Sequence, residues 1–245
     1  MFRRLICKLN CETSGITRKI RGDTLQGVLM EHINSDYAAK LHLQGLNPYS
    51  QYYDSRGGRA LWIIQTMNET AGREIIDPLA SNKFTGFHLD RLNADITISE
   101  KDHSHIAMAD LVKQYYFKQS GRIFHVNFIT PTAFKSNGEY VFFPDIRLIF
   151  GSLMRKYAAV CENTAEADEK TLISIVENAK IISYSLKSTY SVIGTTRLPA
   201  FRGLITIKAQ GAPSLINYIH FLLTFGEYSG VGVKCSMGMG AIEVL

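Results

Sequence analysis

The chain has 245 residues, 46% of them hydrophobic, so it can bury a core in one large domain or in two domains of roughly 120 residues. Its 27 Lys and Arg exceed its 22 Asp and Glu, and the net charge of +5 favours an anionic partner without naming one. No signal peptide or membrane helix is recognisable, because the apolar start breaks at Lys8 and the most apolar later segment, 215–225, is too short to span a bilayer. We therefore expect a cytoplasmic protein with no membrane contact.

The first hundred residues predict a unit that mixes strands and helices. Residues 2–10 have the pattern of an opening strand, and Asp23 with Gln26 three residues later is typical of a helix N-cap. The long helix that follows must end before Gly45. We further expect strands at 60–65, 84–89 and 94–100, and a weaker helix near 69–81.

A second unit begins at residues 122–130, where Phe124, Val126 and Phe128 alternate with polar side chains. Asp145 opens a helix. We also expect strands at 181–189, 201–209 and 241–245, a projecting hairpin that contains residues 188–199, and a last helix that Ser214 caps and Gly226 ends. This β-α-β-β-α-β order is the ferredoxin-like one, and the first half is compatible with a diverged copy.

The predicted fold is therefore α+β, with two tandem ferredoxin-like domains that each pack helices on an antiparallel sheet. The segment 105–119 is expected to cross between them as a short helix, which divides the chain into residues 1–120 and 121–245.

The most informative stretch is residues 226–240, which hold five glycines between a helix and the final strand. Glycine permits a positive φ and lets backbone amides approach a phosphate or sugar, and Lys234 and Ser236 add donors. A tight connection between helix and strand is the alternative interpretation. A dinucleotide-binding site is excluded, because its glycine motif precedes a helix and too few residues remain here to form one.

Several segments together resemble the CRISPR repeat-processing endoribonucleases of the repeat-associated RNA-protein superfamily. These segments are the glycine run, Phe225–Ser229 before it, Thr130–Lys135, and Leu41–Tyr49 with its histidine. They extend from residue 41 to residue 240 and so cover most of the chain. The glycine pattern belongs to the whole superfamily, whereas the early histidine helps to separate enzymes that cut from relatives that do not.

The resemblance implies an endoribonuclease that binds CRISPR repeat RNA and cleaves it in the precursor transcript to make guide RNAs. The reaction is expected to need no cofactor and no metal. The 2′-hydroxyl attacks the neighbouring phosphate and leaves a 2′,3′-cyclic phosphate and a 5′-hydroxyl, which calls for a base, an acid and a cation. The alternative is a noncutting repeat-RNA-binding subunit of a CRISPR interference complex. Whether the chain joins other subunits, and whether it is a monomer or a homodimer, stays open.

His42 is the expected catalytic residue, because an imidazole that titrates near neutrality can take or give a proton. Its neighbour Leu41 belongs to the buried stripe of the helix, so His42 is turned roughly 100° away, toward the domain cleft or solvent. A histidine that merely bonds the last carbonyls of a helix is the alternative.

The helper residues are less well defined by the sequence. In several members of the resembled family a tyrosine on this helix and a lysine just beyond the histidine assist, but here Met30 stands at the first position and no lysine closely follows His42. Tyr37 and Tyr49 are the candidate helpers, or else packing aromatics, and Lys40 is the nearest cation.

RNA binding is expected to use the glycine run and the basic residues of the projecting hairpin, since phosphates dominate affinity. The candidate residues are Gly230, Gly232, Lys234, Ser236, Gly238, Gly240, Arg197, Arg202 and Lys208. The pair His103 and His105 could share a metal ion, but no third ligand is evident, and an exposed polar turn is the preferred interpretation. A two-histidine phosphodiesterase is disfavoured, because it would need a His-x-Thr/Ser motif in each half.

Overall fold

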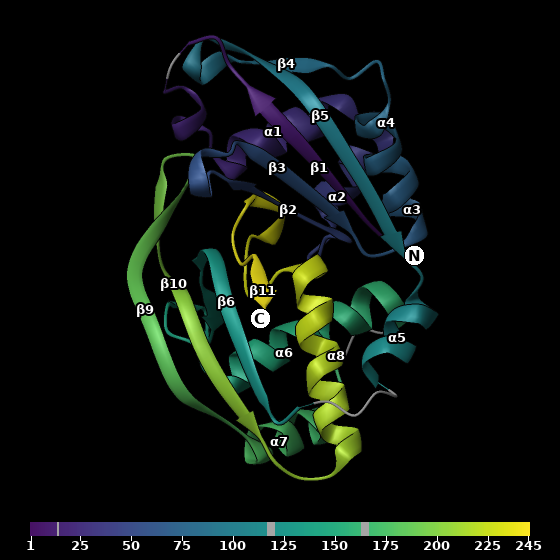
Figure 1. Ribbon diagram of the computed structural model, residues 1–245, viewed down its shortest axis with the longest axis vertical. Helices are drawn as coiled ribbons and strands as arrows, with labels where there is room; N and C mark the ends of the chain where they lie inside the picture. Colours follow the sequence, from purple (N-terminus) through teal and green to yellow (C-terminus); the bar gives the residue numbers. More distant parts are fainter. Residues whose placement is uncertain (14, 117–120, 163–166) are drawn as a thin grey trace.

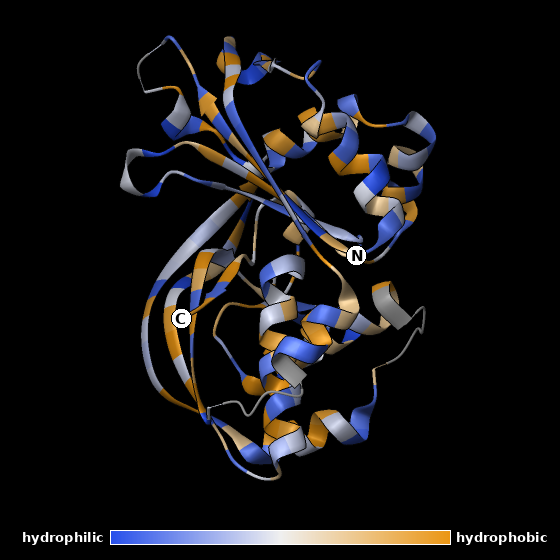
Figure 2. Ribbon diagram, turned by 45° about the vertical axis from the view of Figure 1, so that its right-hand side comes forward, coloured by the Kyte–Doolittle hydropathy of each residue, from blue (hydrophilic) through white to orange (hydrophobic). Residues whose placement is uncertain are grey.

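The computed structural model describes residues 1–13, 15–116, 121–162 and 167–245. Figure 1 shows two sheets that lie one above the other, each covered by its own helices. Along these elements hydrophobic and hydrophilic residues alternate (Figure 2), which is typical of helices and strands with one buried face. Of the helices in the described ranges, none is both long and apolar enough to cross a membrane.

The upper sheet is antiparallel, and its strands are ordered β2-β3-β1-β5-β4. The strands are β1 (Phe2–Asn10), β2 (Tyr49–Asp54), β3 (Leu61–Thr66), β4 (Gly86–Leu89) and β5 (Ala94–Ile106). Without the edge strand β4, this is the ferredoxin-like arrangement, in which the first strand lies between the third and the last. Strand β2 was not predicted from the sequence, because its buried Ser50 and Gln51 hide the usual apolar alternation.

The helices of the upper half are α1 (Gly22–His32), α2 (Ser35–Leu43), α3 (Glu69–Ala71) and α4 (Asp77–Ala80), with a π-helical turn at Gly72–Ile76 between the last two. The single long helix predicted here is wrong: the backbone is extended at Ile33, and Asn34 caps α2 by accepting from two backbone N–H groups. The predicted cap is also wrong, since α1 begins at Gly22 with Arg21 in the cap position. The Asp23 carboxylate instead accepts hydrogen bonds from the Arg21 side chain and the Gly194 N–H.

The lower sheet has the order β11-β6-β10-β9, which is the ferredoxin-like order that the sequence predicts. Its strands are β6 (Ile123–Thr132), β9 (Ala179–Ile193), β10 (Thr196–Ala209) and β11 (Ile242–Val244), and a separate hairpin is formed by β7 (Phe134–Ser136) and β8 (Glu139–Val141). Strands β9 and β10 pair along almost their whole length, and only residues 194–195 separate them. The projecting hairpin predicted to contain residues 188–199 is therefore confirmed, and it forms a long two-stranded ribbon that reaches the upper half (Figure 1).

The helices of the lower half are α5 (Met108–Tyr116), α6 (Ile146–Tyr157), α7 (Glu169–Asn178) and α8 (Pro213–Ser229), and a π-helical turn at Ala158–Glu162 follows α6. The predicted cap of α6 is confirmed, since the Asp145 side chain accepts from the Leu148 N–H at 3.1 Å. The predicted ends of α8 are wrong: its cap position is Ala212 rather than Ser214, and the helix continues through Gly226 to Ser229. Gly226 lies inside α8, where the glycine leaves room for a neighbour, since an added Cβ would be 2.8 Å from the Ile242 side chain.

The two halves are joined by packing as well as by the chain. Phe2, at the start of β1, belongs to the hydrophobic core of the lower half, where its ring lies 5.9 Å from that of Phe225 and 5.3 Å from that of Tyr228. At the other edge, the Gly194 N–H at the tip of the β9–β10 ribbon donates to the Asp23 carboxylate at 2.9 Å.

The connection between the halves contains the short helix that the sequence predicts within the segment 105–119. Strand β5 runs on to Ile106, and α5 occupies Met108–Tyr116. The predicted boundary near residue 120 falls within residues 117–120, outside the described residues.

Candidate functional site

A cleft of about 420 Å³ lies between the two halves of the molecule. The upper half contributes the end of α2 and the loop after it, part of α1, and the start of β2; the lower half contributes the β7–β8 hairpin, α6 and the glycine run. The lining residues that matter below are Gln26, Met30, His42, Asn47, Tyr49, Lys135, Tyr140, Lys156, Lys234, Cys235 and Ser236. His42 and Lys234, which are 192 residues apart in the sequence, therefore line the same cleft.

A larger cavity of about 670 Å³ lies between α6, α7 and α8. The described residues around it include no histidine, lysine or arginine. It therefore offers neither the proton-transfer group nor the positive charge that an RNA-cleaving site needs, and the cleft between the halves is the better candidate.

His42 is exposed in the last turn of α2, next to the buried Leu41. This is the orientation that the sequence predicts. Among the described residues no hydrogen-bond partner holds its ring, so the alternative interpretation as a histidine that bonds the end of its own helix finds no support. The imidazole is free to meet a ligand in the cleft.

The two tyrosines predicted to assist His42 lie in different places, and Tyr49 is the more deeply buried of the two. Tyr49 is 1% exposed, its hydroxyl accepts a hydrogen bond from Gln26 Nε2 at 3.4 Å, and burial raises its pKa to about 12 even though the Gln26 and Ser236 side chains lower it. Its hydroxyl thus stays protonated at neutral pH. Tyr37 packs against the upper core, where burial and Glu74 raise its pKa to about 12.

The residues that line the cleft do not include Tyr37 or the exposed Lys40. Met30 does line it, so the position where the resembled family has a tyrosine holds an apolar side chain.

The glycines of the C-terminal run serve close contacts within the protein. Gly230, Gly232, Gly238 and Gly240 all have a positive φ, between 64° and 92°. An added Cβ would be 2.2 Å from the Ala133 carbonyl oxygen at Gly232, and 2.0 Å from the Val231 carbonyl oxygen at Gly240. At Gly238 it would be 2.8 Å from Gly22 Cα in the upper half. These positions require glycine because backbone meets backbone there.

The amides of these four glycines bond to the protein, which leaves them unsuited to hold a phosphate as the sequence predicts. Gly230 N–H donates to Gly226 O at 2.8 Å, Gly232 N–H to Ser152 Oγ at 2.8 Å, Gly238 N–H to Cys235 O at 3.4 Å, and Gly240 N–H to Pro131 O at 3.0 Å. Among the described residues, the amides of Lys234, Cys235 and Ser236 have no acceptor. These three successive N–H groups, which begin at the left-handed Lys234 (φ 58°), are the part of the run that can hold an anion.

A buried lysine supports the glycine run from below. Lys156 is 6% exposed, and its Nζ donates to Ser229 O at 3.2 Å and Gly230 O at 2.9 Å and lies 2.9 Å from Cys235 Sγ. Sequence analysis missed it, although it lies three residues after Leu153 on the apolar stripe of α6. A charged residue on such a stripe signals a buried polar contact.

A buried glutamine holds the same segment from above. Gln51 Nε2 donates to Gly22 O at 2.6 Å and to Ser236 O at 2.9 Å, while its Oε1 accepts from Trp62 Nε1 at 2.9 Å. Asn47 Nδ2 also donates to Ser236 Oγ, at 3.3 Å. Both halves thus fix the three free amides, and these partners were missed because β2 itself was not predicted.

The hairpin of β7 and β8 adds a further cation. Lys135 is exposed, pairs with Tyr140 across the hairpin, and both side chains line the cleft. The segment that ends at Lys135 was recognised in the sequence, but its lysine received no role. Its position directly after the first strand of the lower half could have indicated that it faces the cleft.

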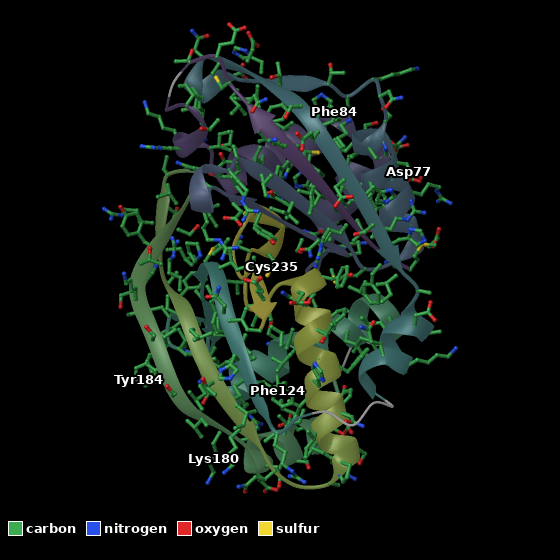
Figure 3. All side chains as sticks on the ribbon, viewed as in Figure 1. Asp77, Phe84, Phe124, Lys180, Tyr184 and Cys235 are labelled. Atoms are coloured by element: carbon green, nitrogen blue, oxygen red, sulfur yellow. The ribbon has the colours of Figure 1, made fainter. Side chains whose placement is uncertain are left out.

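The predicted basic residues of β10 are spread along the strand. The Arg197 guanidinium lies 3.7 Å from the centre of the Tyr190 ring, and the neighbouring Leu198 packs with Met239 of the glycine run. Arg202 pairs across the ribbon with Lys187. Lys208 pairs with Lys180, which Figure 3 labels at the bottom of the molecule, so the prediction that it clusters with Arg197 is wrong. The two lie roughly 35 Å apart along β10.

His103 and His105 lie on strand β5 rather than in the polar turn that the sequence predicts. Their ring centres are 6.5 Å apart. No group of three or more His, Cys, Asp or Glu side chains in the described part of the chain is placed to hold a metal ion.

Comparisons with known proteins agree on one family. Residues 126–242 match the family described as CRISPR-associated endoribonuclease Cas6. The protein of that name from Mycobacterium tuberculosis is 38% identical over 224 residues, which are 91% of this chain and 71% of the relative. The one from Streptococcus thermophilus is 38% identical over 220 residues, 89% and 88% of the two chains. A solved Cas6 product complex aligns over 100% of both chains with a TM-score of 0.81 at 20% identity.

Proposed function

The chain belongs to the Cas6 family of CRISPR-associated endoribonucleases, and on that premise we propose that it binds CRISPR repeat RNA and cleaves it in the precursor transcript to release guide RNAs. The observation that supports this best is the cleft, in which an unbonded imidazole faces a basic wall. The upper of the two proposed domains, residues 1–120, supplies His42, and the lower one, residues 121–245, supplies Lys234 and the free amides.

The reaction that fits these groups is attack by the ribose 2′-hydroxyl on its own 3′-phosphate. A bond forms between O2′ and phosphorus, the bond from phosphorus to O5′ breaks, and a 2′,3′-cyclic phosphate and a 5′-hydroxyl result. We assign the proton transfer at the reacting oxygens to His42, because histidine is the commonest general acid and base and His42 is the histidine among the described residues that line the cleft. Tyr49, which is buried and stays protonated, supports the wall of the cleft through its hydrogen bond with Gln26.

Positive charge for the crowded phosphate comes from the protein. Lys135 and Lys234 line the cleft, and the amides of 234–236 point to no acceptor among the described residues. Those described residues that line the cleft include no Asp or Glu, the side chains that Mg²⁺ and Ca²⁺ prefer. Lysines and amides aimed at the site of developing charge are the alternative means of stabilising the transition state. We therefore propose a metal-independent reaction.

The first experiment incubates the purified protein with the repeat RNA of its own array in EDTA. We expect cleavage, with a cyclic phosphate on one product and a 5′-hydroxyl on the other. A single 2′-deoxy sugar at the scissile position should abolish cutting, and continued cutting there would rule out the proposed attack.

The second experiment replaces His42 with alanine. General acid and base groups contribute about 10²- to 10⁴-fold, so the His42→Ala variant should bind the repeat as the wild type does and cut it at least about 100-fold more slowly. His88→Ala, which removes an exposed histidine from β4 outside the cleft, is the matched control. Tight binding without any cleavage by the wild type would favour a noncutting subunit of an interference complex instead.

A further inference from the structure

Five Phe and Tyr side chains stand out by their exposure. Among the described residues, those of Phe, Tyr or Trp that the solvent reaches most are Tyr140 (42%), Phe142 (47%), Phe143 (56%), Tyr184 (62%) and Tyr190 (50%). They belong to two neighbouring parts of the lower half, namely β8 with the loop after it, and β9. We call these five residues the aromatic row. Figure 3 shows Tyr184 on the outer flank of β9.

The members of the aromatic row are ordered relative to one another. Tyr184 and Tyr190 are an even number of residues apart on β9 and so share one face, along about 20 Å of strand. The Phe143 ring meets the Tyr184 ring edge to face at 6.0 Å. At the other end Arg197 lies over the Tyr190 ring at 3.7 Å. These contacts hold Phe143, Tyr184 and Tyr190 in place, and half or more of each of these side chains stays exposed.

The aromatic row is continuous with the proposed active site. Tyr140, its first member, lines the cleft together with its hairpin partner Lys135. Phe142 and Phe143 follow directly in the chain, and Phe143 leads to Tyr184. The aromatic row therefore begins at the cleft, beside Lys135.

We propose that the aromatic row is a stacking platform for unpaired nucleotides of the RNA that extend beyond the segment held in the cleft, and this rests on the proposed function. Every base offers a π-face, so exposed Phe and Tyr rings bind single strands with little sequence preference. Lys135 and Arg197 stand beside the rings and suit the phosphates that link those bases. A duplex cannot use the platform, because its bases already stack on one another.

A protein strand is the competing occupant, because β9 is an edge of its sheet and pairs with β10 alone among the described strands. Two features favour RNA. Lys180 and Lys187 lie along β9, and lysines on an edge strand discourage pairing with a further strand. The platform also begins at the cleft where the RNA is proposed to lie, whereas a protein strand that paired with the edge of β9 would not need to contact that cleft.

The test measures affinity for repeat RNAs that carry a 2′-deoxy sugar at the scissile position, so that none is cut. The wild type is titrated with the bare repeat and with repeats that carry a single-stranded extension on the 5′ or the 3′ side. We expect one extension to tighten binding by about 10-fold, since stacking contributes about 1–3 kcal/mol per base and 1.4 kcal/mol is tenfold. A complementary strand annealed to that extension should abolish the gain.

The variants then identify the platform. Phe143→Ala/Tyr184→Ala should lose most of the gain from the extension while binding and cutting the bare repeat as the wild type does. A 2-aminopurine placed in the extension should be quenched by the wild type and not by this double variant. Ile173→Ala, which removes an exposed apolar side chain from α7, is the control and should keep the full gain.

The failures are distinguishable. If neither extension tightens binding of the wild type, or if the double variant retains the gain, the platform is wrong even though the bare repeat is bound and cut. If the wild type does not bind the bare repeat, the proposed function itself fails. A double variant that loses a protein partner from its complex, with unchanged binding of extended RNA, would assign the surface to that partner instead.

Discussion

The two walls of the cleft are built in opposite ways. On the lower wall, the segment around Lys234 is fixed from below by Lys156 and from above by Gln51, and its glycines touch neighbouring backbone. On the upper wall, His42 lies in the last turn of a short helix. Its side chain is exposed and makes no hydrogen bond to the described residues. The wall proposed to bind is held by many contacts, whereas the group proposed to react has no hydrogen bond to the described residues.

The difference fits the roles that we propose for the two walls. Amides can receive a phosphate only if they already point at it, since reorienting backbone dipoles on binding would cost the energy that binding supplies. A proton-transfer group needs only the right reach, which the rotatable bonds of a histidine side chain provide. Substitutions in the lower wall should therefore lower stability, and those at His42 should affect only catalysis.

Gly232→Ala should have the largest effect on stability. An alanine Cβ would be 2.2 Å from the Ala133 carbonyl oxygen and would also have to adopt a φ of +79°. We expect the free energy of unfolding, measured in urea, to fall by about 3–5 kcal/mol. Gly138→Ala is the matched control, because Gly138 has a φ of +85° but nothing within 4 Å, and should lose only about 1 kcal/mol. Equal losses would mean that the close approach is unimportant.

Lys156→Met should have the next largest effect. It removes the donor from the buried carbonyls of Ser229 and Gly230, and buried groups left without a partner cost about 1–3 kcal/mol. The variant should unfold at lower urea and bind the repeat more weakly, because the segment above it loses its support. Arg155→Met, on the exposed side of the same helix, should stay within about 0.5 kcal/mol of the wild type. A stable Lys156→Met variant that binds normally would contradict a supporting role.

Asp23→Asn should have a smaller effect, of about 1–2 kcal/mol, and one that depends on pH. Burial alone would raise the Asp23 pKa, but hydrogen bonds from Arg21 and the Gly194 N–H lower it below its ordinary value. Its contribution is therefore complete above the unfolded-state pKa of about 3.9 and is lost as the pH falls through the lower folded-state pKa.

Urea unfolding at pH 7 and at several values below pH 4 checks this. The wild type and Asp23→Asn should differ at pH 7 and converge as the solution becomes more acidic. A difference that persists unchanged at the lowest pH would show that the ribbon tip is not held by the charged form of Asp23.

His42→Ala should have the smallest effect on stability, within about 0.5 kcal/mol, because the side chain is exposed and holds nothing in place. The same variant is expected to lose at least about 100-fold in cleavage rate. Urea unfolding and single-turnover cleavage of one preparation test both halves of the comparison. A destabilised His42→Ala variant would mean that the upper wall is also a structural element.

The sequence predicted most of the strands and helices, because β1, β6 and the helix after Asp145 show their period directly. It failed where a polar side chain is buried by a distant partner. Gln51 lies on a strand with too little apolar alternation to be recognised, and its partners, Gly22 and Ser236, are remote in sequence. Lys208 was misplaced for a related reason, since the length of β10 was underestimated and its basic residues were taken to be neighbours.

Two things about this protein were determined by the sequence alone: the ferredoxin-like order of the lower half, which follows from local periodicity, and the exposure of His42, which follows from the buried Leu41 beside it on the helix. Only the tertiary structure decided what the glycines do. Gly238 meets Gly22 and Gly232 meets Ala133, so the run is a structural strap that leaves three neighbouring amides free. A glycine in the sequence indicates that there is no room for a side chain at that position. It does not indicate which atoms lie close by, because these belong to chain segments that only folding brings together.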